Sequence, residues 1–302
     1  MKLTHLKLLF AAIFWGGTFI AGRIIVQHVG PFSAAFLRFA IASFFLFLLT
    51  KKIEGRYPVI QKEQFLAVCL LGVTGVFSYN FFFFKGLSLI HAGRASLIIA
   101  NNPIIITLLS FLLFKERLSS LKVLGIIISV TGAVIAISKG NIAGLMSESL
   151  GFGELYIFIC VMSWVAYSLI GKFVMANMSP LTAVSFSAVI GAILLFFPAL
   201  HEGMPADIRY YTAIDWFSIF YLGFFGTVLG FVWYYEGINK IGAAKASLFI
   251  NFVPISAIVL AFFLLEEPIT ISLGIGASLV ITGVYLTNSE SIGRRQLPEK
   301  TT

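Results

Sequence analysis

"ASLIIANNPIIITLLSFLLFKERLS" occupies residues 95–119, and "ASLFINFVPISAIVLAFFLLEEPIT" occupies residues 246–270. The two stretches lie 151 residues apart, and ten of their 25 positions are identical, including Pro103, which matches Pro254. Each stretch is apolar over most of its length and carries charged residues near its end. A chain that repeats such a segment is expected to repeat a whole structural unit.

The repeat extends well beyond these two segments. At the same offset of 151 residues, further residues match: Gly72 with Gly223, Gly75 with Gly226, Gly86 with Gly237, Glu116 with Glu267, Gly125 with Gly276, and Thr131-Gly132 with Thr282-Gly283. Nearer the start the offset is 149, and the matches are Trp15 with Trp164, Gly22-Arg23 with Gly171-Lys172, and Pro31 with Pro180. An apolar composition alone gives scattered identities, but not a constant register of Pro, Gly and Glu.

The composition points to lipid as the solvent. Of the 302 residues, 59% are hydrophobic and 11% are charged, whereas a soluble chain has about 25% charged residues. The net charge of +8 does not indicate a nucleic-acid partner, because no stretch is polar enough to form a soluble basic domain.

The apolar stretches predict ten membrane-spanning helices, since about 20 apolar residues cross the hydrocarbon layer. The predicted spans are residues 8–26, 33–50, 65–84, 95–114, 121–138, 154–173, 181–199, 215–235, 245–265 and 271–287. Glycine and proline within them are compatible with membrane helices. The start resembles a signal peptide, but its apolar run is long and contains Trp15, so we expect it to remain as the first span.

The basic residues predict the orientation of these spans. If both termini are cytoplasmic, the inner segments carry 15 of the 21 Lys and Arg residues, the outer loops carry 5, and Arg38 lies within a span. This asymmetry follows the positive-inside rule. We therefore predict a multi-pass protein of the cell membrane, plasma or bacterial inner, with both termini in the cytoplasm.

Each repeat holds five spans, and five is an odd number, so the second copy must enter the membrane from the opposite side. The predicted fold class is an all-α membrane protein of ten transmembrane helices in two inverted five-helix repeats. The predicted units are residues 5–138, a connecting loop at 139–153, residues 154–288, and a cytoplasmic tail at 289–302. Inverted repeats of this kind place a substrate site near the midplane, and the halves rock to expose it alternately.

Three stretches carry a resemblance to a known family: "FWGGTF" at 14–19, "PFSAAFLRF" at 31–39, and the segment from "GLSLIHAGRAS" to "VTGAVI" at 86–135, with its second-half counterpart. The chain resembles the drug/metabolite transporter superfamily, in its EamA-type group of ten-span proteins, over about residues 5–288. The resemblance implies a metabolite carrier, often an exporter of amino acids or similar compounds. The halves differ in polar content, since Arg38 corresponds to Ser187 and Asn101-Asn102 to Phe252-Val253.

The candidate substrate-binding residues are polar or aromatic side chains inside the spans: Trp15, Thr18, Arg38, Tyr79, Asn80, Ser96, Asn101, Asn102, Trp164, Tyr167, Ser168 and Asn251. Trp and Tyr normally gather at membrane interfaces, so deep ones line a cavity or pack between helices. Arg38, about 9 Å into its helix, faces a cavity, tethers helices or snorkels outward. Asn101 and Asn102 precede Pro103, so they bind substrate or link helices.

Charged residues near the span ends have simpler expected roles. Glu116 and Glu267 are expected to contact neighbouring backbone or a basic side chain, with gating as the alternative. Arg94 and Lys245 are expected to anchor the chain at the interface. No cofactor and no metal site is expected, because the four histidines and two cysteines have no ligand spacing.

Two classes of function follow from these patterns. The first is a secondary carrier, and the second is a membrane enzyme or receptor. The sequence has no nucleophile–base pair in a span and no GxxxxGK[ST] loop, which argues against catalysis and direct ATP use. The expected partners are a small-molecule substrate and the bilayer, with no nucleic acid and no obligate protein partner.

The substrate hypothesis rests on the charges at membrane depth. The spans hold no deep carboxylate and one candidate deep cation, Arg38. A zwitterionic or neutral metabolite fits such a site, and an amino acid is the leading hypothesis. Export of cationic drugs is the alternative, since cation–π contacts partly replace a carboxylate.

Overall fold

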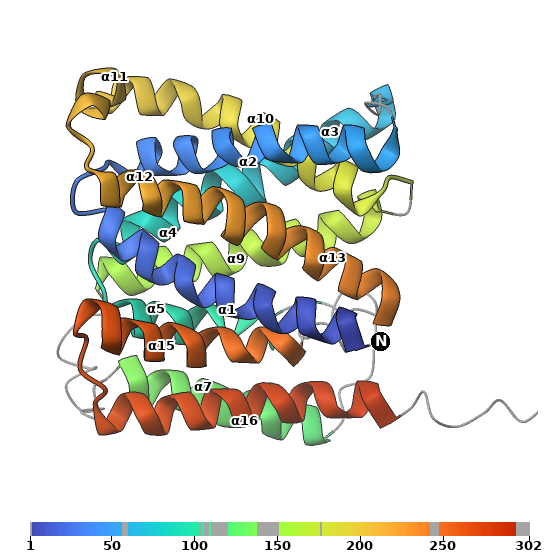
Figure 1. The fold of residues 1–302 in the computed structure, drawn as a ribbon. Helices are drawn as coiled ribbons and strands as arrows, with labels where there is room; N and C mark the ends of the chain where they lie inside the picture. Colours follow the sequence, from blue (N-terminus) through green and yellow to red (C-terminus); the bar gives the residue numbers. More distant parts are fainter. Residues whose placement is uncertain are drawn as a thin grey trace, which may run out of the picture.

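The computed structural model describes residues 2–55, 60–102, 104–105, 109, 120–137, 151–175, 177–241 and 248–293. Every element in these ranges is helical, and the long helices lie side by side in a bundle (Figure 1). The first half contains α1 (Lys2–Ile25), α2 (Pro31–Glu54), α3 (Lys62–Leu71), η1 (Gly72–Ser78), α4 (Tyr79–Leu87), α5 (Ala92–Ile99) and α7 (Ser120–Ile137). The second half contains α9 (Phe152–Val174), α10 (Pro180–His201), α11 (Met204–Asp207), η2 (Ile208–Tyr210), α12 (Ala213–Phe220), η3 (Tyr221–Leu229), α13 (Gly230–Ile241), η4 (Leu248–Asn251), α15 (Phe252–Leu265) and α16 (Ile271–Gly293).

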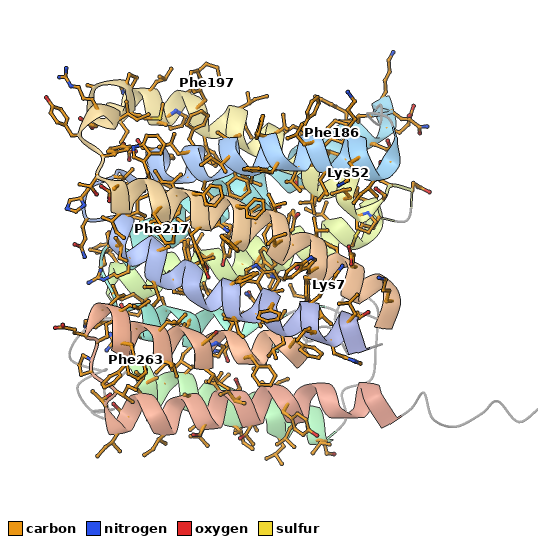
Figure 2. The ribbon with its side chains drawn as sticks, in the orientation of Figure 1. Lys7, Lys52, Phe186, Phe197, Phe217 and Phe263 are labelled. Carbon is orange, nitrogen blue, oxygen red and sulfur yellow. The ribbon has the colours of Figure 1, made fainter. Side chains whose placement is uncertain are left out.

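The outer faces of the bundle are apolar, as lipid requires. Six described helices are long and apolar enough to cross a membrane: Leu3–Ile25, Pro31–Glu54, Lys62–Leu87, Phe152–Gly171, Pro180–His201 and Ala213–Gly237. Phe197, Phe217 and Phe263 point outward and are 65%, 61% and 72% exposed (Figure 2). Large apolar side chains spread over such faces belong in hydrocarbon. The chain is therefore a multi-pass membrane protein.

Four of the ten predicted spans are not among these six. Two of them form helices α7 and α16, which contain the apolar stretches Val123–Ala136 and Ile271–Gly283 among the described residues. The other two, predicted at 95–114 and 245–265, run into residues outside the described ranges, and their described parts include α5 and α15. The described residues thus support six full spans and several shorter apolar helices.

The bundle has two ends, which we call the Lys52 end and the His28 end after residues that lie there. Helix α1 begins at the Lys52 end, and α16 finishes at the same end (Figure 1). Lys7 also lies toward this end (Figure 2), where its Nζ is 2.8 Å from Glu236 Oε2. The turn between α1 and α2, with His28, lies at the opposite end, so α1 crosses the bundle and α2 returns.

Two π-helical turns interrupt otherwise continuous helices. The first, η1, joins α3 to α4, and the second, η3, joins α12 to α13. Residues 72–78 of η1 correspond to residues 223–229 of η3 at the offset of 151. A π-helical turn widens the helix and redirects backbone carbonyls, and such turns often occur at functional sites.

Close helix contacts recur at matched positions of the two halves. A side chain added at any of six glycines would overlap a neighbouring helix, and the contacts form equivalent pairs at offsets of 151 and 149: Gly72–Ile190 with Gly223–Ile41, Gly75–Tyr167 with Gly226–Thr18, and Gly86–Ile157 with Gly237–Leu8. Small residues let membrane helices approach closely. The matched glycines of the sequence therefore mark matched packing contacts.

Helices α7 and α16 pack against each other at one side of the bundle (Figure 1). A side chain added at Gly132 or Gly276 would meet the backbone oxygen of the other, at 2.7 Å in each case. Their backbones therefore approach too closely for a larger residue at either position. This pair lies away from the elements that carry the site described next.

Candidate substrate-binding site

Aromatic rings from α1, α4, α9 and α13 meet inside the bundle. The Trp15 and Trp164 ring centroids are 6.4 Å apart, and Trp15 also lies 5.2 Å from Tyr234. Trp164 lies 5.4 Å from Tyr79 and 5.5 Å from Phe231. We call these five residues the aromatic cluster. Each half of the chain contributes rings to it, so it bridges the two halves.

A second group, the polar triad, consists of Arg38, Asn80 and Thr227. The Arg38 guanidinium donates from Nη1 to Asn80 Oδ1 at 2.9 Å and from Nε to Thr227 Oγ1 at 3.0 Å. Arg38 is 4% exposed, Asn80 1% and Thr227 0%. Arg38 lies seven residues into α2, or about 10 Å along the helix axis. Its side chain is buried in the protein and does not snorkel outward.

The π-helical turns orient the acceptors of the triad. Asn80 Nδ2 donates to the carbonyls of Gly75 and Val76, at 3.3 and 2.8 Å, within η1 and its following turn. Thr227 Oγ1 donates to the carbonyl of Leu222, five residues earlier in η3, at 2.9 Å. With their donor groups occupied, Asn80 and Thr227 can offer Arg38 only lone pairs. Both π-helical turns therefore present a neutral acceptor to one buried cation.

Gly226 connects the triad to the aromatic cluster. Trp15 Nε1 donates to the Gly226 carbonyl at 2.9 Å, and Arg38 Nη2 lies 3.8 Å from the position of a side chain added at Gly226. Thr18 packs its methyl group against Gly226 and donates from Oγ1 to the Trp15 carbonyl at 2.6 Å. Cluster and triad thus form one continuous site.

The charge of Arg38 has no acidic partner in the described part of the chain. The ion pairs among described residues all lie near the two ends of the bundle and do not include Arg38. A buried cation held only by neutral acceptors retains a strong preference for an anion. The site therefore combines an apolar aromatic wall with one positive group.

The other candidate residues are placed differently. Tyr167 is buried, and its ring lies 5.4 Å from that of Trp164, so it extends the cluster. Ser96 and Ser168 donate within their own helices, to the carbonyls of Gly93 and Trp164, both at 2.8 Å. These two hydroxyls are therefore occupied by backbone.

The two adjacent asparagines differ from each other. Asn101 accepts a hydrogen bond from Ser129 Oγ on α7 at 2.8 Å and donates to the Leu97 carbonyl at 2.8 Å, which agrees with the interhelical role. Asn102 is 7% exposed, and its Oδ1 has no hydrogen-bond partner among the described residues. The side chain of Asn251 lies outside the described ones.

The candidate residues drawn from the sequence do not include four members of this group: Thr227, Gly226, Phe231 and Tyr234. The repeat register contained a signal for Thr227, because it is a polar residue opposite Val76, 151 positions earlier. Gly226 was recognised as a repeat glycine but not as the link between Trp15 and Arg38. Nothing in hydropathy distinguishes Phe231 from the many other phenylalanines of the chain.

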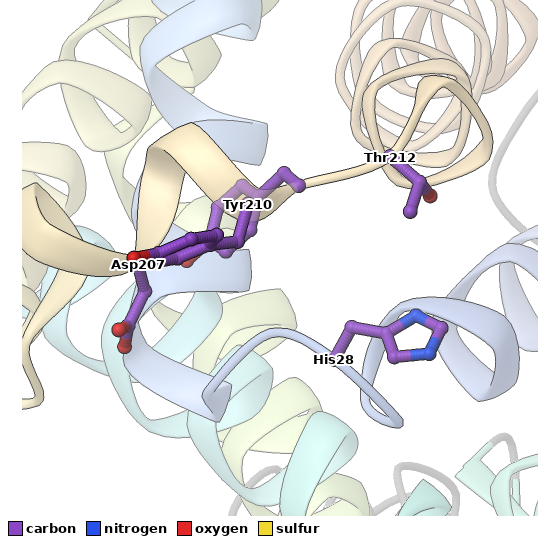
Figure 3. A pocket seen from close by; sticks show the side chains of 5 residues that line it. His28, Asp207, Tyr210 and Thr212 are labelled. Atoms are coloured by element: carbon purple, nitrogen blue, oxygen red, sulfur yellow. The ribbon is translucent and has the colours of Figure 1, made fainter.

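A hollow of about 250 Å³ lies at the His28 end, lined by His28, Asp207, Tyr210, Tyr211 and Thr212 (Figure 3). It lies between the α1–α2 turn and the segment that joins α10 to α12. Burial raises the pKa of Tyr211. The hollow contains none of the residues of the aromatic cluster or the polar triad, so it is a feature of one bundle end.

At each end of the bundle, a contact joins the two halves at equivalent positions. At the His28 end, His28 Nδ1 lies 3.3 Å from Asp215 Oδ1. At the Lys52 end, Gln64 Nε2 donates to the Asn177 carbonyl at 3.3 Å. Gln64 and Asp215 are 151 residues apart, and His28 and Asn177 are 149 apart. These two contacts are equivalent in position, but only the one between His28 and Asp215 joins two titratable side chains.

Glutamates also accept hydrogen bonds between helices at the two ends. Glu202 accepts from the backbone and hydroxyl of Ser33, both at 2.7 Å, while Glu54 accepts from the matched Thr182 hydroxyl at 2.8 Å. Glu267 accepts from the backbone N–H groups of Ala92 and Gly93, at 3.0 and 3.3 Å. Such N–H groups at a helix start favour a carboxylate. The predicted contact of Glu267 with neighbouring backbone is confirmed, and its counterpart Glu116 lies outside the described residues.

Arg94 differs from its expected role as an interface anchor. Its Nη1 lies 2.6 Å from Glu154 Oε1, and the two side chains are 16% and 10% exposed. A largely buried ion pair joins the start of α5 to the start of α9. The sequence did not reveal this pair because the two residues are 60 positions apart.

Comparison with known proteins identifies relatives over nearly the whole chain. The model of the EamA-like transporter family matches residues 2–138 and again residues 151–289. The uncharacterized transporter YyaM of Bacillus subtilis is 31% identical over 280 residues, which cover 93% of this chain and 92% of YyaM. A probable terminal-alkyne amino-acid exporter of Streptantibioticus cattleyicolor is 27% identical, covering 96% and 94% of the two chains. Other relatives, such as YetK and YoaV of Bacillus subtilis, are also named as uncharacterized transporters.

A solved crystal structure has the same fold. It aligns with a TM-score of 0.66 over 94% of this chain and 97% of that chain, at 19% sequence identity. At this level of identity the similarity extends to the fold alone. The helical bundle described above is therefore an arrangement that another protein also adopts.

Proposed function

The chain belongs to the EamA-like transporter family, and from this membership we propose that it is a secondary transporter that carries small metabolites across the cell membrane by alternating access. The observation that carries the proposal is the continuous site of aromatic cluster and polar triad, buried in the bundle and built from both halves. A site at such an interface becomes accessible from one side or the other when the halves rock.

We further propose that the chain consists of ten spans in two inverted five-helix repeats, at residues 5–138 and 154–288. Three pairs of matched glycine contacts support this, as does the equivalence of the contacts at the two bundle ends. Contacts that recur in this way are what a two-fold axis in the membrane plane would generate.

The proposed orientation has both termini in the cytoplasm. The basic residues favour it, and Lys7 and Lys52 lie at the same end as the start of α1. Single cysteines at Lys52 and at the exposed Tyr210 test it with a membrane-impermeant maleimide, after Cys69 and Cys160 are replaced by alanine. Reaction of the Lys52 position from the cytoplasmic side only, and of the Tyr210 position from outside only, is expected. The reverse pattern would contradict the orientation.

The proposed substrate is an amino acid or a similar zwitterionic metabolite, with export as the proposed direction. The relative that is named as a probable amino-acid exporter supports it, as does a site that has an apolar wall and a cation. The proposed binding residues are Trp15, Thr18, Arg38, Tyr79, Asn80, Trp164 and Tyr167, together with Asn102, Thr227, Phe231 and Tyr234. A cationic drug is the second candidate, because five aromatic rings offer cation–π contacts.

Counterflow in vesicles tests this function. The purified protein is reconstituted with an unlabelled amino acid inside and the labelled one outside. Faster uptake with the internal amino acid is expected, because a carrier exchanges bound solutes, whereas a channel gives no such acceleration. Trp164→Leu should raise the half-saturation concentration about 5- to 10-fold, while the outward-facing Phe197→Leu should leave it unchanged. Transport of a permanent cation with no amino-acid transport would favour the drug exporter.

A further inference from the structure

The guanidinium of Arg38 has donor groups that the described residues leave unused. A guanidinium carries five N–H donors, and the described residues accept from Nε and Nη1 only. Nη2 has no hydrogen bond to any described residue, although Arg38 is 96% buried, being 4% exposed. It lies 3.8 Å from the position of a side chain added at Gly226, whose carbonyl accepts from Trp15 Nε1.

The scaffold does not need a cation at this position. In the other half, Ser187 occupies the equivalent position, 149 residues later, and donates to the carbonyl of Val184 at 3.0 Å. The equivalents of the two acceptors are apolar and buried, Val76 for Thr227 and Phe231 for Asn80. Because the same helix packing is built there without a charge, the cation at Arg38 is better explained by a ligand than by folding.

We propose that Arg38 binds the carboxylate of the transported molecule, so that the substrates are carboxylate-bearing metabolites whose remaining part packs on the aromatic cluster. This inference rests on the proposed transport function. Asn80 and Thr227 accept from Nη1 and Nε, which leaves both N–H groups of Nη2 and one N–H of Nη1. The neighbouring Nη1 and Nη2 donors can then form a paired hydrogen bond with two carboxylate oxygens. A single monoanionic carboxylate matches the single positive charge of the triad, whereas a doubly charged phosphate would leave an unpaired negative charge.

Binding measurements with matched ligands test the proposal. Quenching of the tryptophan fluorescence of the purified protein reports occupancy, since Trp15 and Trp164 line the site. The probes are leucine, phenylalanine and threonine, each with its primary amide, which removes the carboxylate charge, and each with its 2-oxo acid, which removes the ammonium. Wild-type protein should bind at least one acid about 10-fold or more tightly than its amide. Equal binding of acid and amide in every pair overturns the proposal.

Variants assign the preference to Arg38. In Arg38→Gln, the acid-to-amide ratio should fall to within about 3-fold, while Arg38→Lys should retain part of it because the charge remains. Arg23→Gln is the matched control: Arg23 binds the Leu87 carbonyl near the His28 end, so its loss should leave the ratio unchanged. A full preference retained in Arg38→Gln overturns the proposal.

A second variant covers the case in which Arg38→Gln does not fold. Asn80→Asp has nearly the same shape and places a carboxylate beside Arg38, where it competes with that of the ligand. The preference for acid over amide should then be lost in a folded protein. If it persists, the proposal is overturned.

The same panel separates this inference from the proposed substrate. If the 2-oxo acids bind with a preference that depends on Arg38 and the amino acids do not bind, the amino-acid hypothesis fails and the carboxylate inference stands. If neither amino acids nor 2-oxo acids bind, the carboxylate inference fails, while transport of another solute in vesicles would still support a carrier.

Discussion

The two halves of this protein pack alike but differ in their chemistry. Matched glycines meet matched neighbours in both halves, and both long helices near the site contain a π-helical turn at the same register. The polar triad, however, has a counterpart without charge, in which two of the three residues are apolar. Across the repeat, Arg38, Asn80 and Thr227 correspond to Ser187, Phe231 and Val76.

This difference separates the residues that helix packing requires from those that a ligand would require. Helix packing depends on the positions of small residues, so a duplicated unit must keep them for both copies to fold. A ligand with a distinct charged end binds in one orientation, so it needs charge in only one of the two equivalent positions. The duplicated scaffold can therefore serve a polar, asymmetric substrate with only one charged copy of the site.

The largest expected effect comes from locking either end of the bundle. In a protein whose native cysteines are replaced by alanine, cysteines are introduced at both His28 and Asp215, or at both Gln64 and Asn177. A short bifunctional crosslinker across either pair should stop transport almost completely, because the proposed alternating access requires the halves to separate at each end in turn. Undiminished turnover at full crosslinking would indicate a channel-like path. The uncrosslinked cysteine variants serve as controls.

The next effect tests the chemical difference between the halves. Thr227→Val gives the triad the residue of its counterpart and leaves Arg38 Nε without an acceptor. A lost partner of a buried charged group costs about 1.5–3 kcal/mol, so transport efficiency should fall about 10-fold or more.

The reverse change, Val76→Thr, is the matched control. Its hydroxyl can bond to a carbonyl of its own helix, as that of Thr227 does, so transport should change less than about 2-fold. Equal losses in the two variants would contradict a special role for the triad. The measurement is initial uptake in vesicles, scaled to the folded protein.

A smaller effect is expected at Asn101, whose counterpart Phe252 is an exposed apolar residue. Asn101→Leu removes the hydrogen bond from Ser129 between helices, which contributes about 0.6–2 kcal/mol in membranes. The melting temperature should fall by a few degrees, while the half-saturation concentration changes less than about 2-fold. Ser129→Ala should have a similar effect. A large change in half-saturation with unchanged melting would instead assign Asn101 to the substrate.

The sequence by itself determined that the helices lie in lipid, that the chain is duplicated, and which residues are candidates for part of the site. Hydropathy and the scarcity of charge are properties of local segments, so they reveal membrane helices without any knowledge of packing. The register of Gly and Pro revealed the duplication, and six of the ten predicted spans correspond to long apolar helices. Trp15, Tyr79, Asn80 and Trp164 could be proposed because polar and aromatic residues are unusual at membrane depth.

Only the tertiary structure decided which of these side chains meet. Arg38 and Thr227 are 189 positions apart and Trp15 and Gly226 are 211 apart, so their contacts depend on which helix faces pack together. The π-helical turns rotate the faces that follow them, which a regular period of 3.6 residues does not anticipate. For this reason Asn101 and Asn80 look alike in the sequence, yet one joins two helices and the other holds the buried cation.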